Sequence, residues 1–483
     1  MATSSIATAA FGLCVGVLLW LYRVNQAMKV VPKETAQAAP RRWTTEEIQE
    51  TYERMKKKPS DFAKHLPPSL DRRYVVFGGA GMVGGDIVLQ LLQRGQSPES
   101  IRIIDFQPVS RQDVKEKAKG STFVKADMTS PASVEAAFST PWPASVAKKP
   151  LTVFHTAAMI DPAARSERLY GRIRRVNVDG TANVLGAAKA AGADIFVATS
   201  SASASFIPAD LWIWPWQSMP GKWYHSATEA DFDSPLRPHD QFFSNYAKSK
   251  AEAERLICGS NQEGFRTGTI RPGNGIYGQK TDPVLGALLT MGGTGTWLIP
   301  MIQNFVDSRN VSLAHLQLEA ALARKPMPPC AGRPLVVTDP GPPLAFGDMY
   351  KLATQLSLPP ITVVPVPPVT LLLLAHAIEI YVSFITRFPG VASALGLKEP
   401  KYPLSFLQPA VLRGATHILI DDSVARRRVE DGGIGYTGVC TSLEGFCEEL
   451  VLWNREYEEG LVGGKGGKGV VEAAGVAARG VGG

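Results

Sequence analysis

The strongest constraint on the fold is a short apolar segment that runs directly into a glycine-rich turn and a helix. Residues 74–77 (YVVF) have the composition of a buried strand, and GGAGMVGG follows at residues 78–85. The next segment has apolar residues at helical spacing. In this order, Gly78 permits a tight turn, Gly81 lets the backbone approach a pyrophosphate, and Gly84 allows close helix packing. Glycines alone are a weak signal, but the strand, turn and helix together predict a dinucleotide site.

An acidic residue occurs where the second strand of such a unit should end. Residues 101–104 (IRII) form the expected strand, and Asp105 closes it 24 residues after Gly81. A carboxylate there accepts hydrogen bonds from the adenosine ribose and repels a 2′-phosphate, so the predicted cofactor is NAD. A turn aspartate without a ligand is the alternative, and NADP stays open as the less favoured cofactor because Arg111 can pair with a phosphate. Asp127, after a third strand, is placed to contact the adenine amino group.

Three residues with reactive side chains follow in the order that hydride chemistry needs. The strand-like IFVATSS brings Ser200 and Ser201 to the carboxyl end of the sheet, where ligands bind in open α/β folds. Tyr246 and Lys250 occur in the helical segment NYAKSKAEAE, where their spacing puts both on one face. A nearby ammonium lowers the pKa of a phenol, so Tyr246 can act as a base. Lys250 would also hold the nicotinamide ribose, while Ser201 orients the substrate oxygen.

The remaining residues exclude other classes of protein. The five cysteines contain no CxxC pair, and no two of the seven histidines are at metal-ligand spacing. We therefore predict no metal and a reducing compartment with buried or inert thiols, and we expect His155 to be a hydrogen-bonded strand-end histidine. The net charge of +7 is spread along the chain without a basic patch interleaved with aromatic residues. This pattern argues against nucleic-acid binding and suits an anionic cofactor or membrane face.

The domain organisation follows from changes in composition along the chain. Strands alternating with helices over residues 71–275 predict an α/β fold, namely an NAD(P)-binding Rossmann fold with a doubly wound parallel sheet. A smaller C-terminal α/β substrate-binding region is expected at residues 276–458. Residues 25–70 are predicted to be a polar juxtamembrane linker containing a capped, solvated helix, and residues 459–483 a flexible Gly/Ala-rich tail.

Two apolar stretches indicate contact with a membrane. Residues 6–22 carry no charge and, with their neighbours, are long enough to span a bilayer, so residues 1–24 are predicted to be a membrane anchor. A signal peptide and a buried helix are the alternatives. The basic residues that follow this stretch orient the body toward the cytosol. The second stretch, residues 369–388, contains His376 and Glu379, so it is predicted to lie in the interface, or to pack on the substrate-binding region, rather than to form a second span. The two stretches together would hold the active-site mouth against the bilayer.

A family resemblance rests, in chain order, on GGAGMVGG, Asp105, HTAA, TSS, YAKSK and IRPGNGIYG. Together these motifs resemble the extended short-chain dehydrogenase/reductases. Later segments narrow the resemblance to the 3β-hydroxysteroid dehydrogenase branch, which includes sterol-4α-carboxylate 3-dehydrogenases; they are NFVDSRNVSLAHLQLEAAL, GRPLVVTDPGPPLAFGDMY and GYTGVCTSLEGFCEELVLW. The resemblance assigns catalysis to Ser201, Tyr246 and Lys250, and NAD binding to Gly78, Gly81, Gly84, Asp105 and Lys250.

The resemblance implies NAD-dependent oxidation of the 3β-hydroxyl of a sterol-like substrate to a ketone. Decarboxylation of a 4α-carboxylate in sterol biosynthesis, or turnover of a related specialised metabolite, fits the same branch. It also implies an endoplasmic reticulum membrane and a homodimer formed through the helix that carries Tyr246. The alternatives are a nucleotide-sugar epimerase or dehydratase and a non-catalytic cofactor-binding scaffold. Dehydration is disfavoured because no acidic pair follows Ser201, and the Ser201, Tyr246 and Lys250 set disfavours the scaffold.

Two features depart from the family pattern. Phe77 occurs where a threonine usually precedes the glycines, a change expected to affect loop packing only. The segment from Ser201 to Tyr246 is longer than usual because of a Trp-rich insertion at residues 210–235. The indole rings of this insertion would cap a flat apolar substrate or dip into the membrane interface, and an ordinary packed loop is the alternative.

Overall fold

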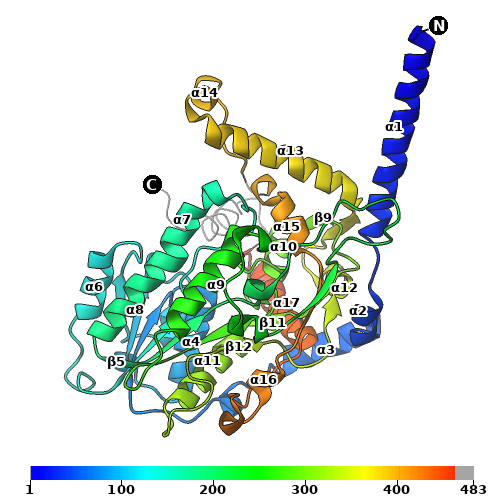
Figure 1. Ribbon diagram of the computed structural model, residues 1–483. Coiled ribbons are helices and arrows are strands. Elements are labelled where there is room, and N and C mark those ends of the chain that lie inside the picture. The colour runs from blue at the N-terminus through cyan, green and yellow to red at the C-terminus, as the bar shows by residue number, and fades with distance from the viewer. Residues whose placement is uncertain (1, 402, 463–483) are drawn as a thin grey trace.

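A seven-stranded parallel sheet forms the centre of the computed structural model, which describes residues 2–401 and 403–462 (Figure 1). The strand order is β12-β7-β5-β4-β1-β2-β3, and all neighbouring strands are parallel. The bounds are β1 Arg73–Phe77, β2 Ile101–Asp105, β3 Thr122–Lys125, β4 Leu151–His155, β5 Ala193–Thr199, β7 Arg266–Pro272 and β12 Pro334–Val337. The order reverses between β1 and β4, so the predicted doubly wound sheet is confirmed.

Helices cover both faces of this sheet because central strands such as β1, β4 and β5 bury apolar side chains on both sides. In β1, Tyr74 and Val76 enter the core beneath α4 (Met82–Gln93) and α11 (Ser308–Leu322). Val75 and Phe77 point the other way, into a core shared with α6, α8 and α9. The bounds of these three helices are Pro131–Ser139, Gly180–Ala190 and Asn245–Cys258. The continuous apolar run in the sequence is therefore the signature of a strand buried between two helical layers.

The Rossmann unit and the substrate-binding region are interleaved along the chain. Strand β12 and helix α11 complete the central sheet, although both come from beyond residue 275. A smaller sheet has the order β13-β10-β15-β6, with bounds Leu344–Ala345, Ile302–Gln303, His417–Ile420 and Tyr224–Ala227. It includes β6 from the Trp-rich insertion, so each region contributes a strand to the other.

The helix expected to be solvated in the polar linker is packed instead, so that prediction is wrong. The helix is α3 (Thr45–Lys57), and it begins with the expected cap, in which Thr44 and Glu47 bond each other's backbone N–H. Ile48 and Met55 are buried against α17 (Ser442–Glu458) and α12 (Phe346–Leu356). The abundance of charged residues hides this narrow apolar stripe, because only one face of the helix needs to be apolar for docking.

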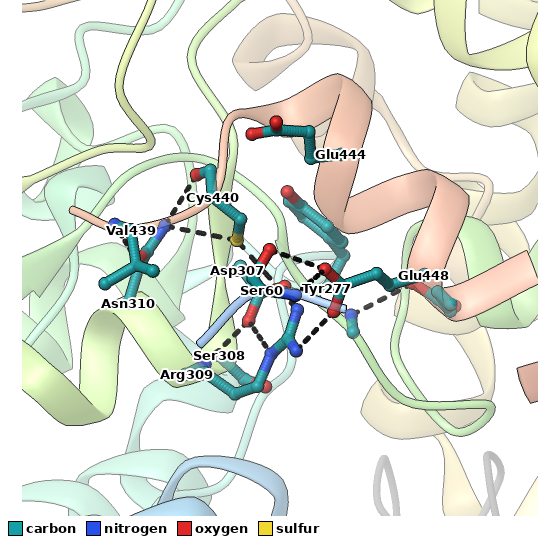
Figure 2. Close-up of polar contacts among 12 residues, drawn as sticks. Ser60, Tyr277, Asp307, Ser308, Arg309, Asn310, Val439, Cys440, Glu444 and Glu448 are labelled. Atoms are coloured by element: carbon teal, nitrogen blue, oxygen red, sulfur yellow. Dashed lines mark hydrogen bonds and ion pairs between the residues drawn. The ribbon is translucent and has the colours of Figure 1, made fainter. Parts of the chain in front are cut away.

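A buried polar cluster fixes α17 to the start of α11 (Figure 2). The Arg309 guanidinium donates to Asp307 at 2.7 Å and to Glu448 of α17 at 2.6 Å. The Tyr277 phenol donates to Asp339 at 2.6 Å. Burial and the neighbouring Asp307 carboxylate raise the pKa of Asp339 to about 7. These bonds join segments that are distant in sequence, so we assign the cluster a structural role.

Two long apolar helices lie outside the sheet layers. Helix α1 (Ala2–Ala27) projects away from the body, and α13 (Pro368–Arg387) extends from near the base of α1 across the top of the view to α14 (Pro389–Ala394) at its far end (Figure 1). Both α1 and α13 are long and apolar enough to cross a membrane, by length and composition. The last turn of α1 packs against the body, where Val24 and Ala27 are buried. Of the predicted tail, residues 463–483 lie outside the described part of the chain.

Candidate active site

The glycine-rich turn is packed too tightly to accept side chains at two positions. Gly78 has a φ of +90°, and a Cβ there would lie 2.5 Å from the backbone nitrogen of Ala157. A Cβ on Gly84 would lie 2.2 Å from the carbonyl oxygen of Gly78. Gly81 precedes the first turn of α4, whose N-terminal N–H groups are therefore brought close to the end of β1. This strand, glycine turn and helix N-terminus fit the pyrophosphate of a dinucleotide, because backbone N–H groups at the start of α4 can face the phosphates.

The carboxylate of Asp105 lies against the same turn. Its Oδ2 accepts a hydrogen bond from the backbone N–H of Ala80 at 3.0 Å, and burial raises its pKa. Arg111, the residue that kept NADP open, is committed to other groups: its Nη2 lies 2.8 Å from Asp86 and 2.7 Å from Asp113. A guanidinium held by two carboxylates is not free for a 2′-phosphate, so this geometry favours NAD.

Asp127 lies in the loop after β3 and is half-buried. Its Oδ1 accepts hydrogen bonds from the N–H and the hydroxyl of Thr129, both at 2.8 Å. The carboxylate thus stabilises its own turn, and its contact with adenine stays a prediction.

The structure brings Ser201, Tyr246 and Lys250 together at the carboxyl end of β5. Ser201 follows β5, and Tyr246 and Lys250 lie one turn apart on α9, which Ser244 caps. The Ser201 hydroxyl donates to the Ser203 hydroxyl at 2.8 Å and lies near enough to the Tyr246 phenol to lower its pKa. The Lys250 Nζ donates to the carbonyl oxygen of Thr199 at 2.9 Å. A substrate hydroxyl can therefore meet a hydroxyl, a phenol and an amine in one place.

Burial controls the protonation of this pair. It raises the pKa of Tyr246 to about 12, against the opposing effect of the hydrogen bond with Ser201. It lowers the pKa of Lys250 to about 8, against the opposing charge of Glu254. We expected Lys250 to lower the pKa of Tyr246, and for this geometry that expectation is wrong. The Lys250 amine is directed to the Thr199 carbonyl, and removal of the phenol from water has the larger effect on its pKa.

His315 on α11 is a residue of the site that sequence reasoning missed. Its Nδ1–H donates to the Val311 carbonyl at 2.8 Å, which leaves Nε2 to accept from the Thr199 hydroxyl at 2.8 Å. The carbonyl of the same threonine accepts from Lys250, so α11 helps to orient the partner of the lysine. Burial lowers the pKa of His315 to about 4, and the ring is neutral at pH 7. Its one sequence signal is a polar residue within the largely apolar segment VSLAHLQL.

Asn177 is a second missed residue, and it lies in a π-helical turn, Arg175–Asp179, just before α8. Its amide donates to the Ser249 hydroxyl on α9 and to the Met159 carbonyl, both at 2.9 Å, and its oxygen accepts from the Met159 N–H at 2.7 Å. The turn thereby ties the loop after β4 to the helix between Tyr246 and Lys250. Sequence periodicity predicts one continuous helix here, because a single wide turn leaves no residue pattern.

His155 behaves largely as expected of a strand-end histidine. It is buried, its Nε2 bonds the Thr181 hydroxyl at 3.0 Å, and burial lowers its pKa to about 3. Its Nδ1 has no hydrogen-bond partner among the described residues. A ring with so low a pKa is a weak base at pH 7, so it is no rival to Tyr246.

The Trp-rich insertion is partly packed and partly exposed. The Trp223 indole is buried and donates to the Val30 carbonyl at 2.9 Å. Trp212 stacks on Trp20 of α1, with ring centroids 5.2 Å apart. Trp214 and Trp216 stack on each other but are 64% and 77% exposed. The packed-loop interpretation therefore describes only part of the insertion.

Comparison with known proteins agrees with this geometry. The model of the 3-beta hydroxysteroid dehydrogenase/isomerase family matches residues 75–360. A decarboxylating sterol-4-alpha-carboxylate 3-dehydrogenase of Schizosaccharomyces pombe is 26% identical over 321 residues, covering 65% of this chain and 83% of that one. A 3-beta-hydroxysteroid dehydrogenase of Mycolicibacterium neoaurum is 31% identical over 211 residues, covering 43% of this chain and 48% of that one.

Solved structures share the fold. A UDP-glucose-4-epimerase from Stenotrophomonas maltophila, solved with NAD and a formylated UDP-arabinopyranose, superposes with a TM-score of 0.51. It is 16% identical and covers 80% of this chain and 99% of that one. At this identity the likeness concerns the fold alone.

Proposed function

Because the chain belongs to the 3-beta hydroxysteroid dehydrogenase/isomerase family, we propose that it is an NAD-dependent dehydrogenase that oxidises the 3β-hydroxyl of a sterol-like lipid to a ketone. The observation that carries this proposal is the meeting of Ser201, Tyr246 and Lys250 at the carboxyl end of the sheet. The relative from Schizosaccharomyces pombe is named a sterol-4-alpha-carboxylate 3-dehydrogenase. This name supports a sterol as the class of substrate.

Each of these residues has one task in the proposed reaction. When bound, NAD supplies the hydride acceptor. Ser201 holds the substrate oxygen by a hydrogen bond, and Tyr246 takes the proton of the hydroxyl as the C3 hydride leaves. Tyr246 therefore starts this step as the phenolate and ends it as the neutral phenol. The positive charge of Lys250 would stabilise the phenolate once its Nζ turns from the Thr199 carbonyl. The lysine is balanced for this task, because its pKa of about 8 keeps most of it protonated at pH 7.

The cofactor is held by the residues around the glycine turn in this proposal. Gly78, Gly81 and Gly84 form the turn that receives the pyrophosphate. Close contacts with neighbouring protein atoms leave no room for side chains at Gly78 and Gly84. Asp105 accepts hydrogen bonds from the adenosine ribose, and Asp127 contacts adenine. The Nζ of Lys250 also reaches the nicotinamide ribose.

A carboxylate on C4 of the substrate would be lost after oxidation. The new C3 ketone is then β to the carboxylate, so the electrons of the breaking carbon–carbon bond pass into the ketone as an enolate. Protonation of C4 completes the step, and carbon dioxide leaves. A 4α-carboxylated sterol, or a specialised metabolite of the same pattern, therefore needs little further catalysis.

Helix α1 is proposed to anchor the protein in the endoplasmic reticulum membrane, with the body on the cytosolic side. The segment Ile6–Ala27 is apolar and, before its last turn, uncovered by the rest of the protein, and Arg23 and Lys29 come at its body end. A homodimer formed through α9 stays an expectation from the family resemblance.

The proposal is tested with membranes that contain the full chain, NAD and a panel of free and 4α-carboxylated sterols. NADH should appear with 3β-hydroxysterols, and carbon dioxide should accompany it only for the carboxylated ones. Membranes carrying Tyr246→Phe provide the matched control. NADH formation with UDP-hexoses and none with any sterol would overturn the proposal.

A further inference from the structure

Helix α13 has an apolar face that the body does not cover. Its buried residues, Leu372, Ala375, Ile378 and Ile385, recur at helical spacing and pack on the protein. The opposite face carries Leu373, Leu374, Ala377, Ile380 and Phe384. Of these, Ile380 is 70% exposed and Leu373 is 47% exposed. An uncovered apolar stripe of this length indicates an interaction surface.

The exposed stripe continues beyond the end of α13. Phe388 lies between the two helices, Val391 in α14 and Leu395 just after it, and all three are exposed. Among residues 380–405, three side chains are basic, Arg387, Lys398 and Lys401, and one is acidic, Glu399. An apolar face with a basic margin is typical of helices that lie on anionic lipid surfaces.

The polar edge of α13 is bonded to the body next to the active site. The Arg165 guanidinium donates to both carboxylate oxygens of Glu379, at 2.6 and 2.7 Å. The carbonyl of the next residue, Ser166, accepts from Asn245, the first residue of α9. Crossing a bilayer would break the Arg165–Glu379 pair and strip the buried stripe of its partners. The geometry therefore favours α13 lying flat over a span.

The exposed surface lies on the side from which α1 leaves the body (Figure 1). The base of α1 contacts α13 directly, and the Asn25 side chain accepts from the Val369 N–H at 3.4 Å. The stacked pair Trp214 and Trp216 belongs to the loop that packs on the same end of α1 through Trp20. Indole rings are favoured at the boundary between lipid and water.

We propose that α13, α14 and the Trp214–Trp216 pair form a second membrane-contact surface, on which α13 lies in the lipid interface while α1 crosses the bilayer. The inference rests on the proposed anchoring by α1. The pocket beneath α13, lined by Arg165, His239, Phe242, Glu379 and Arg413, adjoins the start of α9. Docking would place this pocket at the level of the lipid headgroups, beside the helix that carries Tyr246, so a lipid substrate enters laterally.

The test uses the full chain in vesicles of phosphatidylcholine and phosphatidylserine. Cys14 on α1 is the one exposed cysteine of the described chain, and it carries a fluorescent probe. In a Cys14→Ser background, Ile380→Cys carries the same probe, and Glu263→Cys, before the amino end of β7, is the matched control. Lipids with a spin label near the headgroup should quench the Ile380 probe most. Lipids with a deep label should quench the Cys14 probe most, and neither should quench the Glu263 probe.

Each outcome decides between the two membrane proposals. Quenching at Cys14 with none at Ile380 overturns the second surface and leaves the anchor standing. Quenching at Ile380 alone supports the surface and contradicts the anchor, and absence at both positions overturns both. Protection of the Ile380 probe by self-association in detergent, with no quenching by lipid, would assign the stripe to a second copy of the chain and overturn the proposal.

A kinetic measurement checks the consequence for substrate entry. Ile380→Asp adds a charge at an exposed position, so it should fold normally. We expect it to raise KM severalfold for a sterol presented in vesicles, while KM for NAD and turnover of a detergent-dispersed sterol stay unchanged. An equal loss with both presentations would contradict lateral entry.

Discussion

The proposed cofactor side and the proposed lipid side of the molecule are built in opposite ways. At the glycine turn, backbone atoms are so close that a single methyl group on Gly84 would lie 2.2 Å from a carbonyl oxygen. Across α13 and the Trp loop, large apolar side chains such as Ile380 and Trp216 are 70% and 77% exposed.

The difference teaches where each kind of specificity resides. The pyrophosphate of a dinucleotide has a fixed shape, so its site depends on close backbone contacts that tolerate no change. A lipid surface is fluid, so contact with it depends on the amount of exposed apolar area and tolerates exchange of one apolar side chain for another. Substitutions should therefore be costly on the cofactor side and nearly silent on the lipid side.

Tyr246→Phe should have the largest effect, because it removes the proposed base between the two sides. We expect kcat to fall about 100- to 10,000-fold, the range typical of a lost general base, with NAD affinity retained. The measurement is NADH formation with a 3β-hydroxysterol, alongside NAD binding by titration. Tyr381→Phe on α13 is the control and should keep full activity. An equal loss of activity in the Tyr246 and Tyr381 variants would contradict the assignment of Tyr246 as the base.

His315→Gln should change the pH dependence of stability. The folded chain holds the His315 pKa at about 4, whereas an unfolded histidine titrates near pH 6.5, so the unfolded state gains the proton first as pH falls. His315 therefore lowers the free energy of unfolding by up to about 1.4 kcal/mol per pH unit between those values. In the variant this loss on acidification should disappear. Denaturant titrations at pH 7 and pH 5 measure the change in the free energy of unfolding, and the variant of the exposed His65, His65→Gln, is the control. The same change with pH in the two variants would refute the link between His315 and the pH dependence of stability.

Gly84→Ala tests the tight packing of the cofactor side. The added methyl should destabilise the fold by about 1–3 kcal/mol and weaken NAD binding, because the turn and α4 must separate. Gly186→Ala on the exposed face of α8 meets no atom within 4 Å and should stabilise by about 0.5–1 kcal/mol. Thermal unfolding with and without NAD compares the Gly84 and Gly186 variants. Equal stability and equal stabilisation by NAD in both would contradict the tight packing proposed for the cofactor side.

Ile380→Ser should have the smallest effect on folding. The side chain is 70% exposed, so the free energy of unfolding in detergent should change by less than about 0.5 kcal/mol. Leu372→Ser, two turns earlier on the buried stripe of the same helix, should cost at least about 2 kcal/mol. A similar cost at both positions would show that the body covers both faces of α13.

The cofactor side could be predicted from the sequence because its functional residues occur in short contiguous motifs. Each of its predicted features lies within one short segment: the glycine turn before α4, Asp105 at the end of β2, and Tyr246 with Lys250 at the start of α9. His315 and Asn177 could not be found this way, because they act through contacts between segments far apart in the chain.

The failed expectations have the same origin. The burial of α3 depends on a partner, α17, almost 400 residues away, and its own composition says only that it is highly charged. The pKa of Tyr246 depends on how much water surrounds the phenol, which spacing on a helix does not reveal. Sequence patterns thus locate groups along an element, whereas their environment is set by tertiary packing.

The central claim is that Tyr246 accepts the hydroxyl proton while hydride leaves C3 of a sterol for NAD. The most direct measurement uses a 3β-hydroxysterol deuterated at C3, with mass analysis of the reduced cofactor. We predict one deuterium per NADH for the full chain, and labelled NADH that forms about 100- to 10,000-fold more slowly with Tyr246→Phe. Unlabelled NADH, or deuterium transfer by Tyr246→Phe at the unaltered rate, would contradict the account.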